Sequence, residues 1–220
     1  MSKFFLATGV AVMAMLLTST VHAQGFANGD FETAGSTTPA EGWIPAASGY
    51  SLSTDAFEGS FAAELASPTT TAAVLLQNSV EDGGQASLIA GSNPILSFQA
   101  KGFAGTTGNV LYALRYLDPD GVILSDSGNQ FFQTAINPAT YTEITFDLGV
   151  VPTGADAAFI EFSQAIGPID EANGLLAGSV LIDNIVLIDP NAAAVPEPSS
   201  AALICLSSVG MFLRRRRKVV

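Results

Sequence analysis

Short apolar runs fill the middle of this 220-residue chain, and several of them have a polar residue at every second position. Ile144, Phe146 and Leu148, for example, are separated by a Thr and an Asp. Successive side chains of a strand point to opposite faces, so this pattern predicts strands that are buried on one face only. A chain built from many such strands is expected to form a β-sandwich or a barrel.

Nine short segments are predicted as strands, several of them with this alternation, and residues that favour turns separate them. The sequence Asp-Pro-Asp-Gly at 118–121 predicts a hairpin turn between strands at 110–117 and 122–124. No helical periodicity of useful length appears outside the two ends. We therefore expect an all-β domain with strands at 50–54, 60–65, 72–78, 95–100, 110–117, 130–135, 141–148, 157–164 and 179–188.

Charge is distributed very unevenly along the chain. All 20 acidic residues lie between Asp30 and Glu197, and only Lys101 and Arg115 are basic in this region. Residues 24–198 therefore carry a formal charge of −18, although the whole chain carries −12. Such an acidic body disfavours nucleic acid as a partner, because phosphate binding needs clusters of Lys and Arg.

The N-terminus has the layout of a secretory signal peptide. Lys3 precedes an apolar run at 4–17, and small residues lie in the positions that a peptidase requires. We expect signal peptidase to cleave after Ala23, which assigns 1–23 to the signal peptide. A membrane anchor is the alternative, but the run is short for a hydrocarbon core of ~30 Å.

The C-terminus is a second targeting segment, with an apolar stretch at 199–213 between a Pro-Glu-Pro sequence and a basic cluster. The stretch predicts a single, short transmembrane helix whose basic end stays in the cytoplasm while the body lies outside. The residues expected to direct sorting and processing are Ala23, Val195, Pro196, Glu197, Pro198, Arg214, Arg215, Arg216 and Arg217.

Together, the Val-Pro-Glu-Pro sequence, the apolar helix and the terminal Arg cluster closely resemble the PEP-CTERM sorting signal, here at 195–220. The resemblance implies that an exosortase, an integral-membrane cysteine protease, recognises the tail and removes it near the Pro-Glu-Pro. It also implies transient contact with the inner membrane and export coupled to extracellular polysaccharide. The expected location is the cell envelope, cell surface or extracellular matrix of a Gram-negative-type bacterium.

Four short segments of the body carry a second resemblance, at 28–32, 42–43, 58–65 and 180–187. Their order is similar to that in carbohydrate-binding modules of the family 4 and 9 type. The resemblance implies a galactose-binding-like jelly-roll β-sandwich at 24–190, followed by a linker and sorting tail at 191–220. It is less specific for sugar binding, because one fold serves many functions.

The catalytic options of the body are narrow. The only histidine, His22, lies in the signal peptide, and the only cysteine, Cys205, lies in the tail. The body therefore cannot form a Ser-His-Asp triad, a cysteine nucleophile or a zinc site of the usual kind. Two carboxylates would suffice for a glycosidase, but no motif singles out a pair.

Oxygen ligands remain, and these suit Ca²⁺. The resemblance to carbohydrate-binding modules implies a structural calcium that ties the first strand to the last. It assigns the ligands to the side chains of Glu32, Glu58 and Asp183 and to the main-chain carbonyls of Asp30 and Phe61. Carboxylates gathered there would repel one another, and a divalent cation would remove this penalty. Solvated acids at a sheet edge are the alternative.

Sugar binding needs aromatic faces for stacking and polar groups for hydroxyls. The candidate contacts are Trp43, Tyr112 and Tyr116. Tyr112 and Tyr116 share one face of a predicted strand, with Arg115 on the other. For each candidate a place in the core is the alternative, and for Trp43 it is the favoured one. The adjacent phenylalanines at 131–132 point to opposite faces, so one of them is expected in the core.

The sequence thus predicts an exported protein that binds exopolysaccharide or another matrix glycan without catalysis and carries structural Ca²⁺. Its expected partners are signal peptidase, an exosortase and extracellular polysaccharide. A structural matrix or surface protein without specific sugar binding is the alternative. A small glycoside hydrolase or lyase is a third hypothesis.

Overall fold

The computed structural model describes residues 25–36, 38–67, 71–84, 88–102, 109–165 and 178–189. All of them belong to one compact unit, Ala23–Ala192. The predicted signal peptide and sorting tail, with every predicted sorting residue from Ala23 to Arg217, lie outside the described residues. Within the described ranges, no helix has the length and hydropathy needed to cross a membrane.

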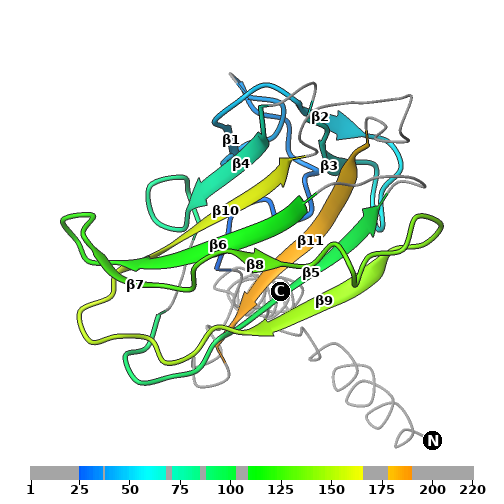
Figure 1. Cartoon of the computed structure of the whole chain (residues 1–220). Helices are drawn as coiled ribbons and strands as arrows, with labels where there is room; N and C mark the ends of the chain where they lie inside the picture. The colour runs from blue at the N-terminus through cyan, green and yellow to red at the C-terminus, as the bar shows by residue number, and fades with distance from the viewer. Residues whose placement is uncertain are drawn as a thin grey trace, which may run out of the picture. The chain divides into compact units, whose positions relative to one another are not determined.

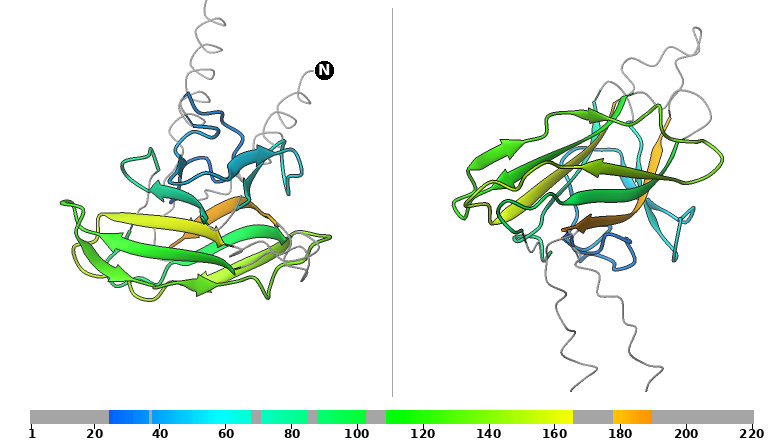
Figure 2. Two further views of the ribbon diagram at one scale, coloured as in Figure 1. Left: turned by 45° about the horizontal axis from the view of Figure 1, so that its top comes forward. Right: turned by 90° about the horizontal axis from the view of Figure 1, so that it is seen from below.

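Two antiparallel sheets form the domain, as Figures 1 and 2 show. The six-stranded sheet has the order β1-β4-β10-β6-β7, and β8 also pairs with β6. The five-stranded sheet has the order β2-β3-β11-β5-β9. The strands are β1 (Ile44–Pro45), β2 (Tyr50–Ser53), β3 (Ala62–Leu65), β4 (Ala73–Asn78), β5 (Ile95–Gly102), β6 (Asn109–Leu117), β7 (Ile123–Asp126), β8 (Gln130–Phe131), β9 (Thr142–Asp147), β10 (Ala157–Ala165) and β11 (Val180–Ile188).

All nine predicted strands are confirmed, and most of their bounds differ by one or two residues. The predicted hairpin is also confirmed, because Asp118 Oδ1 accepts hydrogen bonds from the N–H groups of Asp120 and Val122 at 3.0 and 2.8 Å. Strand β8 is shorter than the predicted 130–135. Strand β1 escaped prediction, because two residues are too few to display an alternating pattern.

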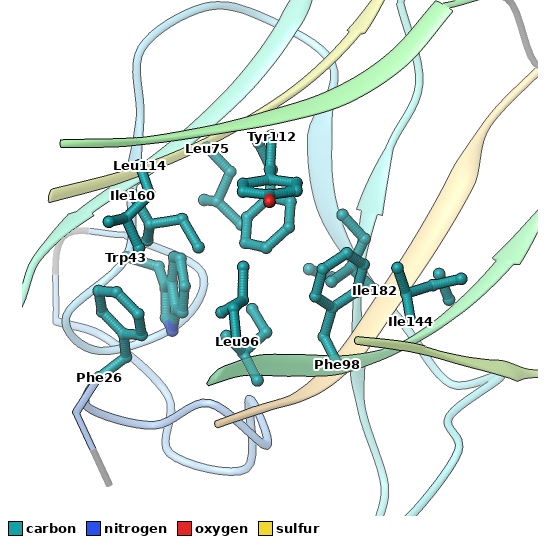
Figure 3. Packing of buried hydrophobic residues seen from close by; sticks show 14 of the residues in the cluster. Phe26, Trp43, Leu75, Leu96, Phe98, Tyr112, Leu114, Ile144, Ile160 and Ile182 are labelled. Carbon is teal, nitrogen blue, oxygen red and sulfur yellow. The ribbon is translucent and has the colours of Figure 1, made fainter. Parts of the chain in front are cut away.

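The hydrophobic core lies between the two sheets. Every second side chain of β5 and β6 points into it, and Figure 3 shows Phe98 from β5 facing Tyr112 from β6. The ring of Phe98 contacts the rings of Phe132 and Phe162 with centroids 5.1 Å apart in each pair. These edge-to-face contacts join the two inner faces, so the predicted β-sandwich is confirmed.

The segment that precedes β1 is held against β11 and β4. The N–H of Ile185 donates to the carbonyl of Gly29 at 2.8 Å. A Cβ at position 29 would lie 2.1 Å from the Ile185 carbonyl oxygen, so only glycine permits this approach. The buried amide of Gln77 bonds both the N–H and the carbonyl of Ala27, at 2.7 and 2.9 Å. These contacts place residues 28–32 beside the last strand.

Candidate functional site

The three aromatic residues predicted to contact sugar are buried in the core. Trp43 has no exposed surface, and Tyr112 and Tyr116 are almost fully buried. The indole Nε1 of Trp43 donates to the carbonyl of Asn28 at 2.9 Å, and its ring packs on Phe31. Burial raises the pKa of Tyr112 to about 12. The prediction that these residues contact a ligand is therefore wrong, and their alternative place in the core holds.

The opposite face of the same strands carries a different set of side chains. Because strand side chains alternate, Leu111 and Arg115 of β6 point away from the core. The register places Phe159 of β10 directly opposite Arg115 on one side and Asp126 of β7 on the other. We call this outer surface of the six-stranded sheet the Arg115 face; its members are Leu76, Asn78, Leu111, Arg115, Asp126, Phe131, Phe159 and Glu161.

Arg115 is the centre of this face. Its Nε lies 3.0 Å from a carboxylate oxygen of Asp126, and its Nη1 lies 3.2 Å from one of Glu161. Its guanidinium carbon lies 5.8 Å from the ring centroid of Phe159, within cation–π range. Desolvation lowers the pKa of Arg115, but the hydrogen bonds to both carboxylates outweigh it, so the pKa is raised overall. The guanidinium thus stays charged and is held from three sides.

Aromatic surface accompanies these polar groups. Phe131 pairs with Leu111 across β8 and β6 and is 53% exposed, while its neighbour Phe132 is 2% exposed in the core. This confirms the prediction that one of the two phenylalanines is buried. Phe159 is half-buried beneath the guanidinium of Arg115. The face therefore offers an exposed ring beside hydrogen-bond donors and acceptors, which is the combination that sugars require.

Sequence reasoning missed most of the Arg115 face. The alternation in 110–117 predicted that Arg115 lies on the other face of its strand from Tyr112 and Tyr116. This was the sequence signal that could have pointed to the face. Phe159, Glu161 and Asp126 come from two other strands, so their approach to Arg115 depends on strand order and register.

The residues predicted to bind calcium lie in a second region. We call it the acidic corner: Glu32, Asp183 and the turn at 57–61. Glu32 Oε1 accepts hydrogen bonds from the N–H groups of Ser60 and Phe61, both at 2.7 Å. Asp183 Oδ2 accepts from those of Phe57 and Glu58 at 2.8 and 3.3 Å. Three segments far apart in sequence therefore meet at this turn.

Asp183 is fully buried on β11. Desolvation raises its pKa to about 6, although the hydrogen bonds from the backbone of Phe57, Glu58 and Asn184 act in the opposite direction. The negative charge of Glu32 raises the pKa further. A bound cation would reverse this penalty, because it favours the ionised form of both carboxylates.

The carboxylate and carbonyl oxygens of the acidic corner are the type of ligand that a hard cation takes, although four backbone N–H groups of the turn also bond to the two carboxylates. The number of carboxylates gathered there is smaller than the resemblance to carbohydrate-binding modules implies. Among the described residues, no group of three or more acidic, His or Cys side chains is arranged to hold a metal. Glu58 is exposed and contributes its N–H rather than a placed carboxylate, and Asp30 is also exposed. Glu32 and Asp183 are the two carboxylates that the fold brings to one turn.

Comparisons with known proteins identify the tail and the fold. Residues 194–218 match the family model of the PEP-CTERM protein-sorting motif. No curated protein matches the sequence. The chain is similar in structure to the enzymatically active domain of tailspike protein 4 of bacteriophage CBA120, with a TM-score of 0.55 and 22% identity over 75% of this chain and 21% of that one.

Two further structures have a TM-score of 0.50. One is of carbohydrate-binding modules from the β-sandwich superfamily, with 15% identity over 78% of this chain and 64% of that one. The other is the arabinose-bound α-L-arabinofuranosidase MgGH51, with 11% identity over 80% of this chain and 28% of that one. The chain spans less than two thirds of each of these three proteins, so the likeness concerns the fold. This chain carries a PEP-CTERM protein-sorting motif, and the domain before the motif has the β-sandwich fold of carbohydrate-binding modules.

Proposed function

We propose that this protein is an exported, non-enzymatic glycan-binding protein and that the Arg115 face holds the glycan. The observation that carries the proposal is the row of Phe159, Arg115 and Asp126 across three neighbouring strands. A solvent-facing sheet surface usually holds scattered polar side chains. This one combines an exposed phenylalanine ring with a fixed guanidinium and two carboxylates.

Each group has a distinct role in this proposal. Phe131 provides a ring face on which the apolar face of a sugar stacks, and Phe159 supports the guanidinium of Arg115 beside it. Asp126 and Glu161 accept hydrogen bonds from sugar hydroxyls, and the guanidinium of Arg115 has N–H groups beyond those in its two ion pairs that can donate. Because the ion pairs hold these side chains in place beforehand, little ordering entropy is lost on binding.

Structural calcium at the acidic corner belongs to the same proposal. Glu32 and the buried carboxylate of Asp183 would hold the ion, with carbonyls such as those of Asp30 and Phe61 and with water completing its coordination. The ion would neutralise two repelling carboxylates and tie the N-terminal segment to β11. Its role would be to stabilise the scaffold, since the acidic corner belongs to the five-stranded sheet and the Arg115 face to the six-stranded one.

The sorting motif supports export to the cell envelope or surface. We infer that signal peptidase and an exosortase process the chain and that its contact with the inner membrane is transient. The glycan would then be an extracellular polysaccharide of the surface or matrix where the mature protein is delivered.

Affinity electrophoresis of residues 23–192 tests the proposal. This compact unit holds the entire described core, so it is the part expected to fold by itself. Phe131→Ala is expected to weaken retardation by a bound polysaccharide about fivefold or more, because it removes a stacking surface worth ~1 kcal/mol. Ile188→Ala is the matched control, since Ile188 is an apolar side chain 44% exposed at the end of β11 in the five-stranded sheet.

The outcomes separate the three hypotheses. Retardation that Phe131→Ala weakens and Ile188→Ala leaves intact supports the Arg115 face. A folded domain that no polysaccharide retards supports a structural matrix protein instead. Release of reducing sugar from any polymer would identify a glycoside hydrolase and overturn the non-enzymatic function.

A further inference from the structure

Both cations of the domain are already paired with carboxylates. Between residues 4 and 213, Lys101 and Arg115 are the only lysine and arginine in the sequence. Lys101 Nζ lies 2.5 Å from Asp55, on the side of the five-stranded sheet. Arg115 pairs with Asp126 and Glu161 together. Neither cation offers an uncompensated charge to a ligand anion.

The Arg115 face as a whole is therefore negative. One guanidinium set between two carboxylates leaves a formal charge of −1 at the centre of the face. It belongs to a stretch, residues 24–198, with a formal charge of −18. A carboxylate or sulfate on a sugar would approach Asp126 and Glu161 as a like charge, and it would have to break an ion pair to reach Arg115. A sugar hydroxyl meets no such barrier.

We propose that the Arg115 face selects glycans built from uncharged sugars and rejects polymers that carry uronate or sulfate groups. This inference rests on the proposed glycan-binding function and adds the chemical class of the ligand. Selection follows from the two carboxylates, which accept hydrogen bonds from hydroxyls and at the same time repel anions. Asp126 and Glu161 are thus specificity-determining residues as well as contacts.

Calorimetric titration of residues 23–192 with matched polymers tests the selection. The uncharged probes are hydroxyethylcellulose, galactomannan and dextran, and the anionic probes are carboxymethylcellulose, hyaluronate and dextran sulfate. We expect the domain to bind at least one uncharged polymer. Its affinity for every anionic polymer should be lower by a factor of about ten or more. Binding to an anionic polymer as tight as to the best uncharged one overturns the selection and leaves glycan binding intact. Absence of binding to all six polymers contradicts the proposed function itself, and the selection falls with it.

Two double variants test whether Asp126 and Glu161 cause the rejection of anionic polymers. Asp126→Asn with Glu161→Gln keeps the side-chain shapes and frees the charge of Arg115. It should raise the affinity for dextran sulfate and carboxymethylcellulose about tenfold at low ionic strength, and added NaCl should abolish this gain. Glu143→Gln with Asp147→Asn makes the same change in net charge on β9 of the other sheet, where both residues are exposed.

The control double variant should change the affinity for anionic polymers by less than about twofold, because its charges lie on the opposite sheet. An equal gain in both double variants would mean that overall charge governs binding, which overturns the proposal. A gain confined to the Asp126 and Glu161 variant supports it.

Discussion

Arg115 and Phe159 face each other across β6 and β10, and the guanidinium carbon of Arg115 lies 5.8 Å from the centroid of the Phe159 ring. The ring supports the guanidinium from one side, and Asp126 and Glu161 hold it at two edges. The guanidinium is therefore fixed in place before any ligand arrives. Because these side chains are already ordered, less conformational entropy is lost when a weakly bound ligand such as a sugar contacts them.

Removal of Arg115 should affect binding more than folding. Its ion pairs are partly exposed, so Arg115→Ala is expected to lower the free energy of unfolding by only about 1–2 kcal/mol. The affinity for an uncharged glycan should fall about tenfold or more, because Asp126 and Glu161 would then repel each other and move apart. Lys101→Ala is the control, since it removes the other cation and its ion pair with Asp55. Equal losses of affinity in the two variants would count against the Arg115 face.

Trp43 should behave as a core residue. Trp43→Phe is expected to lower the free energy of unfolding by about 1–3 kcal/mol, because it leaves a cavity and removes the hydrogen bond to the Asn28 carbonyl. Glycan affinity should stay the same, which isothermal titration calorimetry can measure. Since Trp43 is the only tryptophan, its emission in the wild-type protein should lie at short wavelength and should not respond to bound glycan. Quenching by a glycan would place Trp43 in the binding site after all.

Asp183 should make the metal-free domain sensitive to pH. Its pKa is raised from 3.8 to about 6 in the folded state, so the folded state binds the extra proton. The stabilisation is complete below about pH 4 and is lost as the pH rises through about 6, a difference of roughly 3 kcal/mol in unfolding free energy. Urea denaturation with a chelator present, from pH 4 to 7, measures it. Asp183→Asn should flatten this dependence, and an unchanged slope in that variant would contradict the assignment.

Calcium should raise the melting temperature through the acidic corner. At a Ca²⁺ concentration about 100 times Kd, the expected stabilisation is about 3 kcal/mol. Glu32→Gln should abolish most of it, because the amide keeps an acceptor for Ser60 and Phe61 but loses the charge. Glu41→Gln is the control, an exposed acid of the same N-terminal segment. A melting temperature that neither Ca²⁺ nor a chelator changes would exclude the structural calcium site.

Gly59 holds the turn of the acidic corner in a conformation that other residues adopt with strain. Its φ is +73°, and an added Cβ would lie 2.5 Å from the carboxyl carbon of Glu32. Gly59→Ala should therefore lower the unfolding free energy by about 1–3 kcal/mol and weaken any calcium binding. Gly83 has φ +86° with no atom near its added Cβ. Gly83→Ala thus measures the backbone strain alone, and equal losses in both variants would mean that the contact with Glu32 is unimportant.

Several features followed from local pattern. Short apolar runs between turn residues, several with alternating apolar and polar side chains, predicted nine strands, and Asp-Pro-Asp-Gly predicted the hairpin before β7. Resemblance to known modules anticipated that Glu32, the turn at 57–61 and Asp183 would meet. The sorting motif at 194–218 could be read without any structure, because it is defined by the order of short segments. The lack of His and Cys in the body also excluded several catalytic mechanisms directly.

Tertiary structure decided which face of each strand is buried and which faces solvent. A period of two divides β6 into a face with Tyr112 and Tyr116 and a face with Arg115, but it cannot say which face the second sheet will cover. Tyr112 packs on Phe98 of β5, and both tyrosines lie in the core between the sheets. Strand order and register then brought Phe159, Glu161 and Asp126 to Arg115 from elsewhere in the chain. Sequence thus determined the strands and the sorting tail, while contacts between distant strands assembled the surface proposed to bind glycan.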